Sequence, residues 1–72
     1  MLDSTVFLRM PSVVKKTGIP RASVYEMMER GEFPKPVRLS PRAVAWIESE
    51  IEAWQRGRVA ERNGGASAEV RA

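Results

Sequence analysis

Two short helical patterns lie on either side of Thr17-Gly18-Ile19-Pro20. The first begins at Pro11, whose fixed φ suits an early position in a helix, and it turns Val13 and Val14 inward. Gly18 can adopt the left-handed conformation that ends a helix. Because an isolated helix of about two turns is marginal in water, this helix must pack against a neighbour.

The second pattern runs from Ile19 to Gly31, which closes it. Val24, Met27 and Met28 recur at spacings of three and four residues and form its apolar side. Two helices joined by a tight turn that contains glycine are typical of a helix-turn-helix, whose second helix enters the DNA major groove. The polar side of the second helix holds Arg21, Ala22, Tyr25, Glu26 and Glu29.

After Gly31 the chain changes to a strand pattern. The segment Glu32–Pro36 contains two prolines, which exclude a helix. Residues 37–39 alternate apolar and basic side chains, Ser40-Pro41-Arg42 is typical of a turn, and Ala43–Trp46 suits a second short strand. These segments predict a two-stranded hairpin with basic residues near its tip, which is the shape of a wing.

From Ile47 the apolar residues return to helical spacing, with Ile51 and Trp54 on the same stripe. Acidic residues occupy the opening turns and arginines follow, an order that matches the helix dipole. The pattern predicts a third helix from about Glu48 to at least Arg56. Tryptophans beside such a stripe belong to a core far more often than to a base-stacking surface, so both are expected in the core.

These elements predict a mainly α fold with a small β-hairpin, a winged helix-turn-helix of three helices and a two-stranded wing. A chain of 72 residues suffices for one small domain. We expect a flexible arm over residues 1–6 and the domain over residues 7–58. Residues 59–72 are expected to form the end of the last helix and a disordered tail, which begins at Asn63.

Composition argues against several classes of function. The chain has no cysteine and no histidine, which removes disulfides, zinc fingers and the commonest pairs of nucleophile and base. Glu48 and Glu52 form a carboxylate pair, but charges in the first turns of a helix explain them better than catalysis does. We therefore expect a binding protein that is not an enzyme and takes no cofactor, metal or small-molecule substrate.

Location follows from what the sequence lacks. No apolar window is long enough for a membrane span, and the first residues lack the pattern of a secretory signal. A cytoplasmic location without a membrane partner is expected.

Positive charge is concentrated in one part of the chain. Residues 9–42 hold eight basic and three acidic side chains, a net charge of +5, whereas the rest of the chain holds four basic and six acidic side chains. The positive segment coincides with the helix-turn-helix and the wing, where a polyanion such as DNA would dock.

Several segments carry a resemblance in their order and spacing. Phe7-Leu8-Arg9-Met10-Pro11 precedes the first helix, and Thr17–Tyr25 spans the turn and the start of the second. Arg30–Val37, with its Gly-Glu-Phe-Pro-Lys-Pro core, is followed by Arg42–Trp46 and Glu48–Trp54. Together, over residues 7 to 58, they resemble the AlpA family of small phage and mobile-element regulators.

The resemblance implies a winged helix-turn-helix related to excisionases and to MerR-type DNA-binding domains. It implies a transcriptional regulator of an integrase gene, or a recombination directionality factor that favours excision of a prophage or integrative element. Duplex DNA is the implied partner, and an integrase is a second. A domain this small makes few base contacts, so further copies on adjacent DNA sites are also expected.

The chain departs from the family pattern at two positions. The family usually has a serine before the recognition helix and an arginine after the tyrosine, where this chain has Pro20 and Glu26. Pro20 has no side-chain oxygen to cap the helix. Glu26 either accepts from a cytosine amino group or pairs with a neighbour such as Arg30, four residues further on.

Carried over residue by residue, the resemblance implies two groups of DNA contacts. Arg21 is the leading residue for reading a base, because a guanidinium can bond two acceptors of guanine. Lys15 and Lys16, late in the first helix, are weaker candidates. The implied contacts are Arg21, Ala22, Ser23 and Tyr25 on the recognition helix, with Lys35, Arg38 and Arg42 on the wing.

A protein-interaction module is the alternative from another class. In that hypothesis the basic face of a small winged-helix adaptor or antitoxin meets an acidic protein. Binding of duplex DNA without any partner, weakened by salt, would distinguish the two hypotheses.

Overall fold

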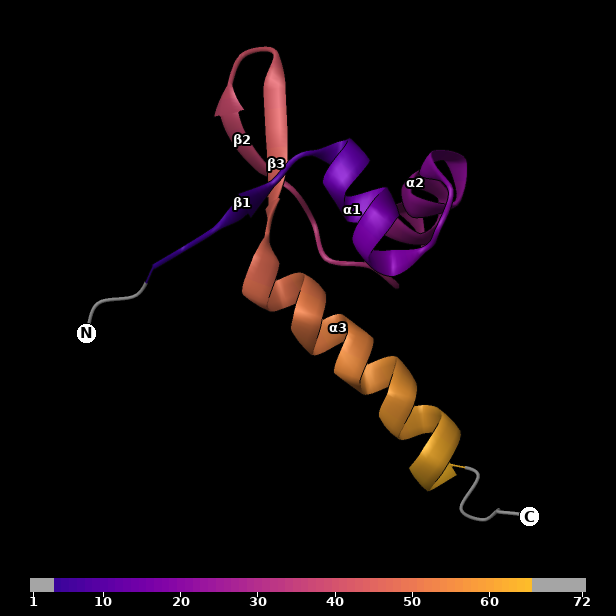
Figure 1. The fold of residues 1–72 in the computed structure, drawn as a ribbon. Helices are drawn as coiled ribbons and strands as arrows, with labels where there is room; N and C mark the ends of the chain where they lie inside the picture. The colour runs from indigo at the N-terminus through magenta and orange to yellow at the C-terminus, as the bar shows by residue number, and fades with distance from the viewer. Residues whose placement is uncertain (1–3, 66–72) are drawn as a thin grey trace.

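The structure is a computed structural model and describes residues 4–65 of the chain. Helices α1 and α2 lie on one side of a small sheet, the hairpin of β2 and β3 projects as a wing, and α3 leads away from its base (Figure 1). This arrangement confirms the predicted winged helix-turn-helix. Within residues 4–65, no helix has the length and apolar character needed to cross a membrane.

Helix α1 spans Met10–Thr17 and begins one residue before Pro11. Val13 is fully buried, whereas Val14 is only half-buried because it lies at the edge of the apolar stripe. Gly18 ends the helix at φ 76°, and its amide donates to the carbonyl of Val14 over 2.8 Å. The predicted left-handed cap at Gly18 is confirmed, since this φ favours glycine.

Helix α2 spans Arg21–Glu29, with Pro20 at the N-cap. Val24 is fully buried, and Met27 and Met28 pack against the core from the same side. Gly31 follows the helix at φ 74°, and the chain turns there toward the wing. The predicted apolar face of the recognition helix is therefore confirmed.

The sheet has three strands in the order β1-β3-β2, where a two-stranded wing was predicted. Strands β2 (Val37–Ser40) and β3 (Ala43–Ile47) form the wing. Strand β1 (Phe7–Leu8) pairs antiparallel with the base of β3, with Leu8 opposite Trp46. Two residues are too few to show alternation, so only the tertiary pairing makes this segment a strand.

Helix α3 spans Glu48–Ala60 and continues as a π-helix over Glu61–Gly65. No proline interrupts this stretch, and Arg58 pairs with Glu61 one turn later at 3.4 Å. The expectation of a disordered tail from Asn63 is therefore wrong for residues 63–65, which are helical. The rest of the expected tail, residues 66–72, lies outside the described residues.

The core lies where α1, α2, the sheet and α3 meet. Trp46 is 1% exposed, and its indole donates to the carbonyl of Pro34 over 3.0 Å. The rings of Trp54 and Phe33 pack edge to face, with their centres 4.9 Å apart. The Trp54 indole N–H donates to the carbonyl of Glu32 over 2.8 Å. Both tryptophans thus belong to the core, as predicted, and they attach residues 32–34 to the sheet and to α3. The fully buried or nearly buried residues are Val13, Val24, Phe33, Ala45, Trp46 and Ile51.

Candidate nucleic-acid interface

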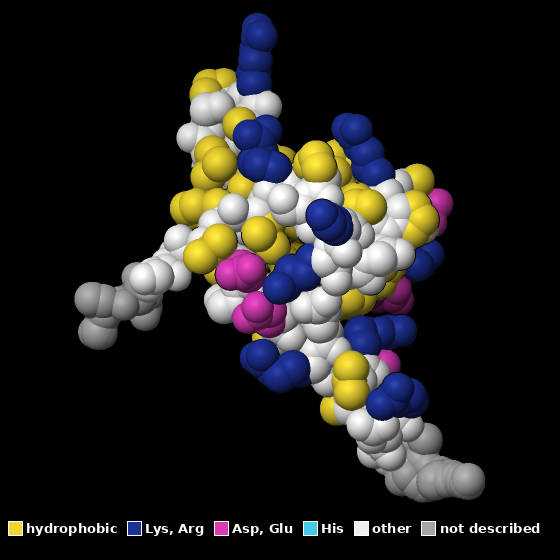
Figure 2. Space-filling model, viewed as in Figure 1, with side chains coloured by type: hydrophobic (Ala, Val, Ile, Leu, Met, Phe, Trp, Pro, Cys, Tyr) yellow, Lys and Arg dark blue, Asp and Glu magenta, His cyan; other side chains and the backbone are white. Residues whose placement is uncertain are grey.

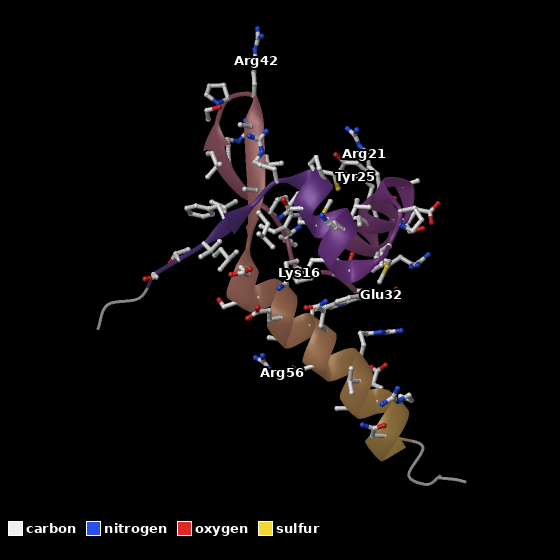
Figure 3. The ribbon with its side chains drawn as sticks, viewed as in Figure 1. Lys16, Arg21, Tyr25, Glu32, Arg42 and Arg56 are labelled. Carbon is white, nitrogen blue, oxygen red and sulfur yellow. The ribbon has the colours of Figure 1, made fainter. Side chains whose placement is uncertain are left out.

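A hollow of about 210 Å³ separates the start of α2 from the wing. Arg21 and Tyr25 line it from α2, Arg42 from the wing, and Arg9 from the junction of β1 and α1. In Figure 3, Arg21 and Tyr25 lie together at one end of α2, and Arg42 stands at the tip of the wing. Arginine residues from three separate segments therefore line one concave surface, and the Arg42 side chain extends outward from the tip of the wing (Figure 3). Its apolar lining comes from Met10, Pro11, Val44 and Trp46.

The exposed face of α2 includes most of the predicted contact residues. Arg21, Ala22 and Tyr25 are exposed, and the guanidinium carbon of Arg21 lies 5.8 Å from the centre of the Tyr25 ring. That distance suits a cation–π contact, which orients the two side chains together. Ser23 is half-buried and lies about 200° around the helix from Arg21, because successive residues are about 100° apart. Ser23 is not brought to the hollow.

On the wing, the turn is held by its own hydrogen bonds. The guanidinium of Arg38 donates to the carbonyl of Pro41 over 3.2 Å, and the amide of Arg42 donates to the Ser40 hydroxyl over 3.4 Å. Arg38 is the cross-strand partner of Val44, so both side chains are on one face of the wing. Since Val44 lines the hollow, Arg38 extends the basic surface along that side.

Lys35 is exposed on the connection between α2 and β2. It does not line the hollow. The bond from Trp46 to Pro34 holds the connection against the sheet next to Lys35. Of the seven predicted contact residues, three line the hollow, namely Arg21, Tyr25 and Arg42. The other four, Ala22, Ser23, Lys35 and Arg38, do not line it.

Lys16 points to another part of the molecule. Its amine lies 3.1 Å from a Glu52 carboxylate oxygen and 3.6 Å from one of Glu48. The hydrogen bond to Glu52 raises the pKa of Lys16 above its ordinary value of 10.5. Glu48 and Glu52 therefore serve as partners of α1, and Lys16 is directed toward α3 (Figure 3).

The arginines that line the hollow carry positive charge that no ion pair neutralises within the described residues. Within residues 4–65, Arg9, Arg21 and Arg42 form no ion pair, whereas Lys16, Arg30 and Arg58 each pair with a glutamate. Figure 2 shows Lys and Arg side chains along the wing and the upper edge of the helices, with a group of acidic side chains near the start of α3. This surface suits a polyanion.

Comparison of the chain with known protein families gives a match to one family. The family described as "Prophage CP4-57 regulatory protein (AlpA)" matches residues 6–59, which include both helices of the helix-turn-helix, the wing and most of α3. The chain belongs to the AlpA family. The resemblance seen in the sequence is thereby confirmed.

Two relatives illustrate the AlpA family. The chain is 45% identical over 62 residues to "Uncharacterized protein ORF88" of Enterobacteria phage P4, a match that covers 86% of this chain and 70% of the relative. It is 40% identical over 53 residues to "DNA-binding transcriptional activator AlpA" of Escherichia coli K12, covering 65% of this chain and 76% of the relative. The second relative is named for DNA binding.

The two departures from the usual AlpA family pattern have different structural outcomes. Pro20 occupies the N-cap of α2 without a side-chain cap bond, as its chemistry requires. Of the two alternatives for Glu26, the pair with Arg30 is not formed, because the Arg30 guanidinium binds a Glu32 carboxylate oxygen at 3.1 Å. Gly31 turns the chain directly after the helix, and this turn brings Glu32 back to Arg30. Glu26 stays exposed on α2.

Arg9 is the member of this surface that the sequence-based assignment leaves out. In the sequence it is one of eight basic residues in the positive segment, and it lies outside both the recognition helix and the wing. Its nearness to Arg21 and Arg42 comes from the pairing of β1 with β3, which no periodicity indicates. In the sequence, only its positive charge and its position directly before the first helix indicated that Arg9 belongs to the DNA-binding surface.

Proposed function

We propose that this AlpA-family chain binds duplex DNA sequence-specifically and regulates transcription. The observation that carries the proposal is the hollow between α2 and the wing, which Arg9, Arg21 and Arg42 line. The relative named as a DNA-binding transcriptional activator supports it. DNA binding also gives a role to Arg9, Arg21 and Arg42, which form no ion pair within residues 4–65.

In the proposed complex, α2 enters the major groove and presents its exposed side to base edges. Arg21 bonds guanine, and Ala22 contacts a thymine methyl group. Tyr25 bonds a phosphate or a base edge, whereas Ser23, half-buried on the other side of α2, is left out of these contacts. Glu26, which Arg30 does not neutralise, accepts from a cytosine amino group.

The wing follows the DNA backbone beside the recognition helix. Arg38 and Arg42 are on its exposed surface, and Lys35 precedes its first strand. Lysine and arginine contacts to phosphate position a protein on DNA without selecting a sequence. These three side chains therefore supply affinity, and α2 supplies the sequence preference.

We further propose that the protein acts on an integrative element or prophage, as a regulator of an integrase gene, as a recombination directionality factor, or as both. A relative from a phage supports this context. A single recognition helix reads few base pairs, so specific sites require several copies or bent DNA. Phe7 and Leu39, on the two edge strands, are 46% and 45% exposed and offer apolar area for contacts between copies or with an integrase.

Footprinting tests the proposal directly. The purified protein is incubated with DNA that flanks its own gene and the attachment site of the element, and protected bases are mapped. Protection of one promoter site indicates transcriptional regulation, whereas adjacent protected repeats beside the attachment site indicate excision. Absence of protection on any duplex, with a correctly folded protein, would contradict DNA binding.

The adaptor or antitoxin hypothesis predicts no sequence-specific footprint on duplex DNA. An interaction module needs an acidic protein partner and shows only weak, sequence-independent affinity for DNA. A competition experiment with unlabelled random duplex separates the two, because a sequence-specific binder keeps its footprint in excess competitor.

A further inference from the structure

We infer that the hollow between α2 and the wing seats one segment of the sugar–phosphate backbone, and that Arg9 is a phosphate-contacting residue. This inference rests on the proposed DNA binding and adds a contact outside the recognition helix and the wing. The ligand class is a phosphodiester of duplex DNA with its flanking deoxyribose.

The position of the hollow follows the geometry of duplex DNA. The major groove is about 12 Å wide and the minor groove about 6 Å, and one strand's backbone separates them. If α2 lies in the major groove and the wing lies over the adjacent minor groove, that backbone passes between them. The hollow is the surface that lies between α2 and the wing.

Arg9 is held in place by its neighbours on both sides. It is the N-cap of α1 in an extended conformation, with φ −83° and ψ 168°, and its side chain makes no capping bond. Leu8 before it pairs with Trp46, and the amide of Val13 after it donates to the Arg9 carbonyl over 3.0 Å. The backbone is therefore fixed while the guanidinium stays exposed and, within residues 4–65, without an ion-pair partner.

The chemistry of the hollow suits a phosphodiester. Arg9, Arg21 and Arg42 line the hollow from three separate segments, and none of the described residues that line it is acidic. A guanidinium fork matches two phosphate oxygens, and charge-assisted bonds of this kind are among the stronger hydrogen bonds. The side chains of Met10 and Val44 lie beside the arginines and offer apolar contact to a sugar ring.

The test compares Arg9→Gln with Arg56→Gln as a matched control. Arg56 is also exposed and, within the described residues, unpaired, but it lies on α3 away from the hollow (Figure 3). Binding is measured by fluorescence anisotropy at 50 to 200 mM KCl, on a duplex that the wild-type protein enriches from a random library. Thermal melts check that each variant is folded.

The slope of log K against log salt is negative, and in Arg9→Gln it is expected to be shallower by about 0.9. This change corresponds to the loss of one phosphate contact. Over this four-fold range of salt, the ratio of wild-type to variant affinity changes by about 3.5-fold. Arg9→Lys keeps the charge and restores the slope, and Arg56→Gln leaves it unchanged. The library preference of Arg9→Gln stays that of the wild type, because phosphate carries no sequence information.

Two results overturn the inference while leaving the proposed function intact. One is an Arg9→Gln variant with the wild-type slope, and the other is an equal loss of slope in Arg56→Gln, which reports a diffuse charge effect. A wild-type protein that fails to bind any duplex contradicts the proposed function itself.

Discussion

Arg21 combines two features that suit a base-reading residue. It is exposed in the first turn of α2, and its contact with Tyr25 limits the directions that its guanidinium can take. Arg38, by comparison, is on a strand of the wing and is bonded to the turn carbonyl of Pro41. At the scale of single residues, Arg21 should therefore contribute to sequence preference, and Arg38 should contribute to affinity for any sequence.

Replacing Arg21 by alanine is expected to cost about 1 to 3 kcal/mol of binding free energy and to relax preference at one base pair. Arg38→Ala is expected to weaken all sequences alike. Affinities for single-base variants of the enriched duplex provide the measurement. Unchanged affinity and preference in Arg21→Ala would show that α2 is not the reading helix.

Pro20 affects stability through a missing bond. It is at the N-cap of α2, and Ile19 before it packs against the core cluster that contains Val24, in the arrangement of a hydrophobic staple. Pro20→Ser is expected to supply an acceptor for the amide of Ala22 or Ser23. The domain should be stabilised by up to ~1 kcal/mol, less the entropy gained by the unfolded chain. A thermal melt that shows a lower melting temperature for the variant would contradict a capping role.

At the scale of elements, polar contacts attach the end of α1 to α3. The Lys16 amine reaches Glu52 and Glu48, and the Gln55 side chain donates to the Lys16 carbonyl over 3.0 Å. A cation near the last turn of α1 also complements the helix dipole. The pairs are partly exposed, so each contributes modestly.

The pH dependence of this junction has a definite sign. Because the folded state raises the pKa of Lys16, its contribution to stability is fully present below the ordinary value of 10.5 and is lost as pH rises through the folded pKa. Lys16→Met is expected to have a lower melting temperature than the wild type at neutral pH. The difference in melting temperature should shrink as the pH rises above 10.5. Lys16→Arg keeps its charge and serves as the control. An equal difference at neutral and strongly alkaline pH would contradict the ion-pair role.

The π-helix that follows α3 is expected to contribute little to stability. Residues 61–64 are exposed, and the buried core residues lie between Val13 and Ile51. Deleting Asn63 to Ala72 should therefore leave the melting temperature and the affinity for a single DNA site nearly unchanged. Melting curves and anisotropy on one site give the comparison. Loss of assembly on DNA with several sites would instead show that this end joins neighbouring copies.

At the scale of the whole molecule, the arginines that line the hollow form no ion pair within the described residues, whereas Lys16 is paired where α1 meets α3. Contacts from Arg9, Lys35, Arg38 and Arg42 to four phosphates predict a slope of log K against log salt of about −3.6, or about −4.5 if Arg21 also meets one. Titrations across salt concentrations measure it. A flat dependence would remove the electrostatic basis of DNA binding.

The sequence by itself determined the helices of the helix-turn-helix, the wing and the apolar faces that form the core. These features depend on local rules: Gly18 can take a positive φ, Val24 and Met28 recur at helical spacing, and prolines exclude a helix before the wing. Local rules also indicated that α2 begins without a side-chain cap from Pro20, which has no side-chain oxygen. Local rules were insufficient to predict a strand as short as two residues, or a contact between residues that lie far apart in the sequence.

Only the tertiary structure decided the third strand, the partner of Arg30 and the make-up of the hollow. Phe7-Leu8 is a strand because β3 offers it backbone groups, and Arg30 pairs with Glu32 because Gly31 reverses the chain. Arg9 and Arg42, which are 33 positions apart in the sequence, line the same hollow because β1 pairs with β3. Such neighbours are set by which backbone groups pair and which faces bury together, and these depend on contacts between distant segments that no local pattern records.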